Sequence, residues 1–317
     1  MSTECRIEWN VLSLEDWNKI YSGIPRASLL QSYDYARAIC LSQKKSAKWG
    51  HIFINDQSAG IIQTIEISVL GRLFHTIELD LGPLWREGFG TTDHIRAFFK
   101  TLNKQAPKRP GRKRRILPGT VCTPENMKIF EDLKIKKLPR PGYQTIWLDL
   151  RQDEQTLRRN LHSKWRNKLN KSEKKGLSVS FSTDIEELPS VLKGYEQDKT
   201  IKNYDGPSVQ LLRIMAAVFS QQNNVLIGQA KLDNRCVAAI VIFIHGRSAT
   251  YQIGWTTDDG RDCAAHNLLL WQAMMDLKSR NILDFDLGGT NDESAKRVKN
   301  FKKGMGGQTT LYLGHYI

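Results

Sequence analysis

The segment Leu161 to Gly176, LHSKWRNKLNKSEKKG, combines helical spacing with a high positive charge. It holds six Lys or Arg residues and a single acid, Glu173. A charged helix face is often only a solvated surface, but one neighbouring acid balances little of this charge. A basic surface of this kind attracts polyanions, such as nucleic acid or an anionic membrane. The cations that could follow a row of phosphates are Lys164, Arg166, Lys168, Lys171 and Lys174.

The positive charge of the whole chain is confined to one segment. Thr101 to Lys175 holds 21 Lys or Arg against 7 Asp or Glu, and this excess equals the net charge of +14 of the 317-residue chain. The remaining residues are therefore neutral in sum. The loop KRPGRKRR, Lys108 to Arg115, belongs to this segment and, taken by itself, is interpreted as a solvated loop. The distribution predicts one basic face on an otherwise neutral protein.

Three residues in the second half could take part in chemistry. Lys302 ends a short predicted helix before a glycine-rich turn; its ammonium could stabilise negative charge on a reacting oxygen or merely favour the helix dipole. Asp286, in the buried strand DFDLGG, could act as a base or only accept structural hydrogen bonds. Tyr251, in the strand YQIGW, could face a cleft or belong to the core. The residues alone leave these alternatives open.

Most other kinds of site lack support in the sequence. There is no P-loop, G-x-S-x-G, H-E-x-x-H or G-x-G-x-x-G motif, which argues against a hydrolase, an NTPase or a dinucleotide-binding protein. The five cysteines are scattered without a C-x-x-C pair, which argues against disulfides and structural zinc. The polar start MSTECRIEWN lacks the apolar core of a signal peptide, and no apolar run is long enough to span a membrane. We therefore expect a cytoplasmic protein without a metal.

The second half predicts a mixed series of helices and strands. A helix is expected over about Asp153 to Lys175, because apolar residues recur every four positions from Leu157 to Leu169 and Gly176 can end it. Trp165 lies on this apolar stripe and is predicted to be in the core. The elements that follow are the strand LSVSFST, helices near 185–202 and 207–221, the strands NVLIGQAKL, CVAAIVIFIH and SATYQIGW, a helix at 264–279, the strand ILDFDLGG, a helix at 293–302 and the strand TTLYLGHYI.

The first half repeats this order of elements. The strand CRIEWNV is followed by helices at 14–22 and 32–42, then by the strands KWGHIFIN, AGIIQTIEISVL and RLFHTIELDL. A helix at 92–104, the strand RRILP, a helix at 125–133 and the strand YQTIWLDL complete the half. The repeat predicts an α/β fold with mixed sheets (α+β character), built as two similar domains with a ligand-binding cleft between them.

Four motifs in the expected order resemble the FemABX-type (FemAB-like) peptidyltransferases of the GNAT superfamily. LRRNLHSKWRNKLNKSEKKGLSV resembles the segment that opens the second domain of that family. LDFDLGG followed by VKNFKKGMGG, Val298 to Gly307, resembles its C-terminal signature, a D-x-G-G strand end followed by F-K. LDLGPLW, Leu79 to Trp85, and QSYDYARA resemble first-domain elements. The element order is also that of GNAT-type acyltransferases, and the resemblance spans nearly the whole chain.

The resemblance implies two tandem GNAT-like domains and an acyl-transfer activity. Residues 1–150 would form the acceptor-side domain, with residues 308–317 as a strand that could complete it, and residues 151–307 would form the donor-side domain. Members of the family carry an amino acid from aminoacyl-tRNA to an amine of a peptidoglycan precursor. The implied partners are therefore aminoacyl-tRNA and such a precursor or another small amine. The resemblance implies neither a cofactor nor a metal.

The same resemblance assigns roles to individual residues. Phe301 and Lys302 correspond to positions that line the aminoacyl site, where the Lys302 ammonium would stabilise the oxyanion formed during transfer. Arg37 corresponds to a position, usually lysine, that holds an acceptor phosphate. The basic residues of the segment 164–174 would contact the acceptor stem of the tRNA. The residues predicted on the acceptor side are Arg37, Arg86, Tyr251 and Asp286.

Two departures from the family keep other functions open. The acceptor-binding positions of cell-wall enzymes have no match around ILPGTVCTPEN. The pyrophosphate loop of CoA-binding relatives needs glycines, but RDCAAHNLL, Arg261 to Leu269, has none. Besides an aminoacyl-tRNA-dependent transferase, the alternatives are a CoA-dependent N-acyltransferase acting on a polysaccharide or metabolite amine, and a non-catalytic nucleic-acid-binding protein on the same scaffold.

Overall fold

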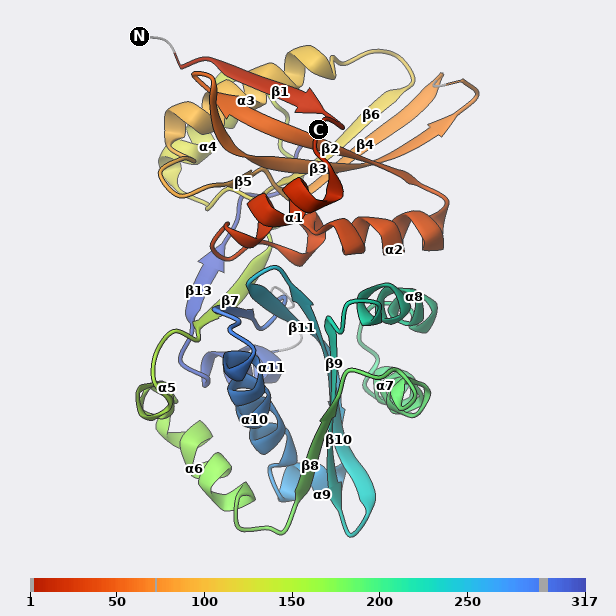
Figure 1. Ribbon diagram of the computed structural model, residues 1–317, viewed down its shortest axis with the longest axis vertical. Helices are drawn as coiled ribbons and strands as arrows, with labels where there is room; N and C mark the ends of the chain where they lie inside the picture. The colour runs from red at the N-terminus through yellow and green to blue at the C-terminus, as the bar shows by residue number, and fades with distance from the viewer. Residues whose placement is uncertain (1–2, 72, 291–295) are drawn as a thin grey trace. The chain divides into compact units, whose positions relative to one another are not determined.

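The chain folds into two compact units (Figure 1). The computed structural model describes residues 3–71, 73–290 and 296–317. Residues 1–144 and 310–317 form the first unit, and residues 145–309 form the second. Each unit is organised around one β-sheet with mixed strand directions and helices packed on it. The predicted α/β fold is therefore confirmed, whereas the cleft between the domains stays a prediction.

The first unit is built on a six-stranded sheet. Its strands run in the order β1-β2-β3-β4-β6, with β5 paired to β3. Neighbouring strands are antiparallel except β4 and β6, which are parallel. The strands are β1 (Cys5–Trp9), β2 (Ser46–Ile54), β3 (Gln57–Val69), β4 (Phe74–Gly82), β5 (Leu84–Trp85) and β6 (Arg112–Pro118). The helices are α1 (Leu14–Ser22), the 3-10 helix η1 (Leu29–Gln31), α2 (Tyr33–Gln43), α3 (Thr92–Gln105) and α4 (Pro124–Asp132).

Local sequence explains where these helices start and which face of the sheet they cover. Adjacent residues of a strand point to opposite faces. Ile61 accordingly belongs to a core with Trp17 of α1, whereas Ile62 belongs to a core with Phe98 of α3.

Each of the four α-helices of the first unit begins after a residue whose side-chain hydroxyl accepts a hydrogen bond from the backbone N–H three residues later. These caps are Ser13, Ser32, Thr91 and Thr123.

The second unit has a seven-stranded sheet in the order β13-β7-β12-β11-β10-β9-β8. The pair β11 and β12 is parallel, and the pairs β7–β12, β10–β11, β9–β10 and β8–β9 are antiparallel. The strands are β7 (Gln144–Asp149), β8 (Ser178–Ser182), β9 (Val225–Leu232), β10 (Arg235–His245), β11 (Ser248–Thr256), β12 (Asp284–Asp286) and β13 (Gln308–Leu311). The helices are α5 (Glu154–Asn160), α6 (Ser163–Ser172), α7 (Leu188–Lys202), α8 (Val209–Ser220), α9 (Asp258–Asp262), α10 (Ala265–Ser279) and α11 (Lys296–Lys303). Residues 293–295 of the predicted helix 293–302 lie outside the described residues.

The single helix predicted over 153–175 is wrong, because the chain breaks it into α5 and α6. Leu161 and His162 have extended backbones with ψ of 134° and 144°. The His162 N–H donates to the carbonyl of Gly304 at 2.9 Å, a bond that a continuous helix would not allow. The break leaves the Leu161 carbonyl outside the hydrogen-bond pattern of either helix, and the Arg166 guanidinium donates to this carbonyl at 3.4 Å. The apolar stripe survives the break, and Trp165 is buried as predicted.

The last predicted strand of each half does not stay within the domain that the sequence-based limits assign to it. The strand β7 is predicted in the first domain, but it pairs with β12 in the second sheet. In the first unit, the place beside β6 is taken instead by the C-terminal tail, where Tyr316 forms an antiparallel bridge with Ile116. The predicted final strand is regular only over β13, and its later residues form such bridges. The second unit therefore begins at Thr145 rather than at residue 151.

Glycines after α11 allow the C-terminal signature to pack against the helix break. A Cβ on Gly304 would lie 2.8 Å from the Trp165 ring, and one on Gly306 would overlap the backbone oxygen of Asn160. Gly306 also has a φ of +82°, which other residues rarely adopt. Gly306 is thus required by close backbone contact between this loop and the end of α5, and Gly304 by close contact with Trp165 on α6.

We expect Gly306→Ala to destabilise the second unit by about 2–4 kcal/mol, because the substitution adds a backbone clash to an unfavourable φ. Gly176→Ala is the matched control. Gly176 also has a positive φ of +66°, but among the described residues no atom lies within 4 Å of the position that an alanine Cβ would take. The control should lose only about 1 kcal/mol. Urea unfolding followed by fluorescence measures both, and equal losses would contradict the packing argument.

Candidate active site

A buried polar cluster lies in the second unit where β11 and β12 separate. The two strands pair only from Ser248–Asp284 to Thr250–Asp286, although β11 continues to Thr256. After Asp286 the chain turns through Gly288, which has a φ of +72° and passes close to the carbonyl of Tyr251. The end of β12, the middle of β11 and the end of α11 thus supply side chains to one region.

Lys302 is a buried cation in this region, and the residue is only 7% exposed. The ammonium donates to the carbonyl of Gly289 at 3.0 Å and lies 5.5 Å from the centre of the Tyr251 ring. Burial lowers the pKa of Lys302 to about 8, an effect opposed by the negative charge of Asp286. Lys302 therefore keeps its proton at neutral pH and loses it in mildly alkaline solution.

Asp286 is the buried acid of the cluster. Its Oδ1 accepts from the Gly288 N–H at 2.8 Å and is hydrogen-bonded to the hydroxyl of Thr145. That hydroxyl also lies 3.0 Å from the carbonyl oxygen of Gly288. Burial raises the pKa of Asp286 to about 6, although its hydrogen bonds and Lys302 favour the charged form. The Thr145 hydroxyl has one proton but contacts two oxygens, the Oδ1 of Asp286 and the carbonyl oxygen of Gly288. Both contacts are hydrogen bonds only when Asp286 is protonated and donates to the Thr145 oxygen.

Aromatic side chains enclose the polar groups on one side. The Tyr251 hydroxyl contacts Nε2 of His266 at 3.1 Å. Burial lowers the pKa of His266 to about 4, so the imidazole is neutral near pH 7, and burial raises the pKa of Tyr251. The ring of Phe301 lies 5.6 Å from His266 and 5.9 Å from Trp165 on α6. These neutral rings shield Lys302 and Asp286 from water and thereby strengthen their electrostatic effects.

This geometry can support acyl transfer. Between about pH 6 and pH 8, Asp286 is charged as a carboxylate and Lys302 as an ammonium. A carboxylate can accept the proton of an attacking amine, and an ammonium can stabilise an oxyanion. Within the described ranges, no three His, Cys, Asp or Glu side chains are grouped as a metal site would require.

The basic helix α6 is linked to the cluster through its buried face. Trp165 contacts Phe301, while Lys164, Lys168 and Lys174 on or just after the helix are exposed. Two of the predicted cations also have contacts within the fold. Lys171 donates to the carbonyl of Asp262 at 3.1 Å, and Arg166 donates to the carbonyls of Arg159 and Leu161.

The four residues predicted on the acceptor side are divided between the units. Tyr251 and Asp286 belong to the cluster around Lys302, whereas Arg37 and Arg86 belong to the first unit. Arg37 on α2 lies 3.8 Å from the carboxylate of Asp34. Exposed Arg86 follows β5 and donates to the carbonyl of Ser58 at 3.3 Å. The predicted joint role of these four residues stays a prediction.

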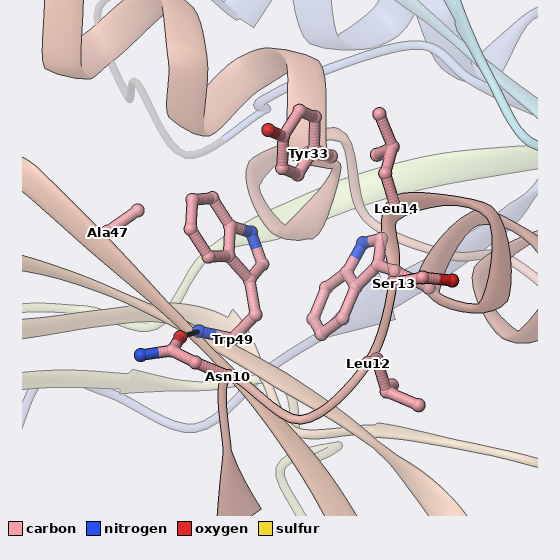
Figure 2. Close-up of a pocket in the computed structure, with 8 residues that line it drawn as sticks. Asn10, Leu12, Ser13, Leu14, Tyr33, Ala47 and Trp49 are labelled. Carbon is pink, nitrogen blue, oxygen red and sulfur yellow. Dashed lines mark hydrogen bonds between the residues drawn. The ribbon is translucent and has the colours of Figure 1, made fainter.

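The first unit contains an aromatic pocket near the start of α2. Its volume is about 260 Å³, and Figure 2 shows Tyr33, Trp49 and Leu14 around it. The rings of Tyr33 and Trp49 lie 5.0 Å apart, and the side chain of Asn10 accepts from the Trp49 backbone N–H at 3.1 Å. Tyr33 and Arg37 are four residues apart on α2, so they share one face of the helix. An apolar surface therefore lies one helical turn from a cation.

Sequence reasoning missed several residues of the cluster. His266 lies at the start of α10, within RDCAAHNLL, a segment whose sequence is notable only for its lack of glycines. Thr145 is fully buried in β7, and its contact with Asp286 joins residues 141 positions apart. A small polar residue in an otherwise apolar buried run was the only signal for Thr145.

Comparisons with known proteins agree with this architecture. A model of the acetyltransferase (GNAT) domain family matches residues 158–303, which include Tyr251, His266, Asp286 and Lys302. No curated protein sequence matches the chain. The crystal structure of FemX is similar with a TM-score of 0.80 and 12% sequence identity, over 98% of this chain and 96% of FemX.

Two further solved structures share the fold at lower similarity. A tandem GNAT protein from the clavulanic acid biosynthesis pathway has a TM-score of 0.53 and 12% identity, covering 98% of each chain. L-PGS from Bacillus licheniformis has a TM-score of 0.51 and 12% identity, over 96% of this chain and 89% of that one. The predicted fold, two tandem GNAT-like domains as in FemX, is confirmed. The reaction class that the matched domain model supports, over residues 158–303, is acyl transfer.

Proposed function

From this FemABX-like tandem GNAT fold, we propose that the chain moves an amino acid from aminoacyl-tRNA to an amine of a peptidoglycan precursor or another small-molecule or peptide acceptor. The observation that carries the proposal is the buried Lys302 ammonium near the Asp286 carboxyl, within the segment that matches the GNAT domain model. Acyl transfer to an amine needs both a proton acceptor and a positive charge at the developing oxyanion.

The proposed reaction uses these two groups in succession. The neutral acceptor amine attacks the ester carbonyl carbon of the aminoacyl-tRNA, a C–N bond forms, and the carbonyl oxygen becomes an oxyanion that Lys302 stabilises. The ester C–O bond then breaks, and its electron pair goes to the ribose oxygen of the tRNA. Asp286 accepts the proton of the amine and passes it to that oxygen. The products are an amide and a deacylated tRNA, so no further reactant is required.

The donor is proposed to bind along α6. Exposed Lys164, Lys168 and Lys174 supply cations for phosphates, and Trp165 on the buried side of α6 contacts Phe301, the neighbour of Lys302. One short helix thus connects a polyanion-binding surface with the reacting groups. The alternative donor, acyl-CoA, is less favoured because Ala264 rather than glycine stands before α10, and Arg261 is already bonded to the carbonyl of Thr256.

The acceptor is proposed to bind in the first unit. The aromatic pocket beside Tyr33 and Trp49 suits an apolar or ring-shaped group, and Arg37 on the same face of α2 suits an anionic group next to it. Arg86 is a second candidate cation of this unit. These features fit an acceptor that combines a ring with a phosphate or carboxylate.

The reaction is tested by following label that leaves the tRNA. The protein is incubated with a pool of radiolabelled aminoacyl-tRNAs and candidate amines, among them peptidoglycan precursors, and acyl-CoA is supplied in parallel. We expect label to move from RNA into an acid-stable amide only when an amine is present. Label retained on every tRNA together with thiol release from CoA would replace this proposal by the CoA-dependent one. Binding of tRNA without transfer would favour the non-catalytic alternative.

The role of α6 is tested separately by the salt dependence of tRNA binding. Replacing Lys164, Lys168 and Lys174 by glutamine should weaken binding and make log K less dependent on log salt concentration. The expected change in slope is about 0.9 for each lost contact to a duplex phosphate, or about 0.7 on a single strand. Filter binding over a series of salt concentrations measures the slope.

A variant with the same loss of charge serves as the control. It replaces three exposed lysines on other elements by glutamine: Lys19, Lys100 and Lys193. If this control reduces the slope as much as the α6 variant, the contacts are not specific to α6 and the proposed binding surface is wrong.

A further inference from the structure

The hairpin that joins β3 to β4 ends in an exposed apolar tip. Val69, Leu70, Leu73 and Phe74 are 52%, 71%, 60% and 55% exposed. They make up four of the eleven large hydrophobic side chains that are exposed among the described residues. Single exposed hydrophobic residues are common on proteins, but four within one turn form a patch that usually indicates an interaction.

The backbone of the tip does not explain these residues. Leu70 and Gly71 have positive φ values of +50° and +61°, and the Leu73 N–H donates to the Leu70 carbonyl at 3.1 Å. Glycine, asparagine and aspartate are the residues that suit a positive φ in a hairpin turn, whereas leucine is strained there. Leu70 is therefore unfavourable for the turn and exposed to water. Neither the turn nor the core accounts for its presence.

Basic residues begin directly beside this apolar tip. Strand β6 runs parallel to β4, with His75 opposite Arg112, so the start of β6 lies at the same end of the sheet as the hairpin tip (Figure 1). Gly111 passes so close to the Leu73 carbonyl that a Cβ would overlap it. Lys108 and Lys113 of this segment are exposed. The run KRPGRKRR, which by itself is interpreted as a solvated loop, is thus joined to a hydrophobic tip.

We propose that this tip docks on the surface of an anionic phospholipid bilayer. The leucines and Phe74 would enter the boundary between headgroups and acyl chains, and Lys108 and Lys113 would face the anionic headgroups. A protruding tip of few residues suits a fluid surface, whereas a stable protein interface needs a broad and closely packed area. Nucleic acid would use the cations but would offer no apolar layer to the leucines.

The contact is peripheral. No helix in the described part of the chain is both long and apolar enough to cross a bilayer. The proposal is independent of the acyl-transfer reaction, because the tip contains none of the residues assigned to it. Its consequence for function is that the first unit would be held where amines carried by membrane-associated molecules are concentrated.

Vesicle flotation with the full chain tests the proposal. We expect the protein to float with vesicles that contain phosphatidylglycerol, to bind vesicles of phosphatidylcholine alone much more weakly, and to be released at high salt. Leu70→Ser combined with Leu73→Ser should reduce binding to the phosphatidylglycerol vesicles by about tenfold or more. Ile201→Ser, which replaces an 82% exposed apolar side chain of α7, should leave binding unchanged.

A second pair of variants separates the charge from the apolar contact. Lys108→Glu combined with Lys113→Glu should weaken binding to the anionic vesicles and leave the weak binding to phosphatidylcholine unchanged. Two substitutions of exposed lysines elsewhere, Lys19→Glu combined with Lys193→Glu, give the same net charge and should have a much smaller effect. Absence of binding to anionic vesicles, or equal losses in the tip and control variants, overturns the proposal.

Discussion

Replacing Lys302 by methionine is expected to lower the rate of aminoacyl transfer by ~10²–10³-fold, the usual cost of losing one group that stabilises an oxyanion. Methionine keeps the length and volume of the lysine stem but removes the ammonium that donates to Gly289. Lys302 is buried beside Asp286, so the substitution leaves the Asp286 carboxylate without its cation and the Gly289 carbonyl without this donor, and it should lower stability. Transfer rates and thermal unfolding of the same preparation measure both effects.

The neighbouring residue provides the control for this substitution. Lys303 is on the same helix but exposed, so Lys303→Met should keep nearly the full rate. In the native enzyme the rate should fall as the pH rises above about 8, because the lowered pKa of Lys302 then leaves it uncharged. A folded Lys302→Met variant with unchanged turnover would remove Lys302 from the chemistry.

Replacing Asp286 by asparagine is expected to lower the rate by about 10²-fold or more, the contribution typical of a general base. Burial raises the pKa of Asp286 to about 6, and the base must be deprotonated to act. The rate of the native enzyme should therefore fall as the pH drops below about 6. In Asp286→Asn this acid limb should disappear along with most of the activity. Rates measured across the pH range, with binding kept saturating, give the result.

Two further variants distinguish a base from a structural carboxyl. The hydrogen bond from Thr145 lowers the pKa of Asp286, so Thr145→Val should move the acid limb to higher pH. Asp284 on the same strand pairs with Arg151 at 3.0 Å, and Asp284→Asn should cost stability without moving the limb. An acid limb that persists in Asp286→Asn, or that does not move in Thr145→Val, would leave Asp286 with a structural role only.

The sequence was sufficient to predict the fold class and most of the order of elements, although not the break between α5 and α6 or the short elements η1, β5 and α9. The side chains of a strand return to the same face every 2 residues, and those of a helix every 3.6 residues. The spacing of apolar residues therefore indicates strands and helices without coordinates. The burial of Trp165 and the positive φ of Gly176 followed from the same local rules. The concentration of charge between Thr101 and Lys175 was also visible, because it requires only counting.

Local rules failed where a distant segment changed the outcome. The apolar stripe from Leu157 to Leu169 fits one helix, but a hydrogen bond between His162 and Gly304 makes a break more favourable. Strand β7 has the same buried run from Thr145 to Leu148 whichever sheet it joins, so only its pairing with β12 shows that it belongs to the second unit. Hydrophobic patterns specify that a strand is buried and do not specify its partner.

The candidate site divides in the same way. Residue types and a family resemblance were enough to single out Lys302, Phe301, Tyr251 and Asp286. The lowered pKa of Lys302 and the raised pKa of Asp286 arise from burial, which the sequence does not contain. His266 and Thr145 entered the cluster only through contacts across the fold. Sequence by itself determined which groups were available, and the tertiary structure decided their proximity and protonation, because desolvation and long-range contacts exist only in the folded chain.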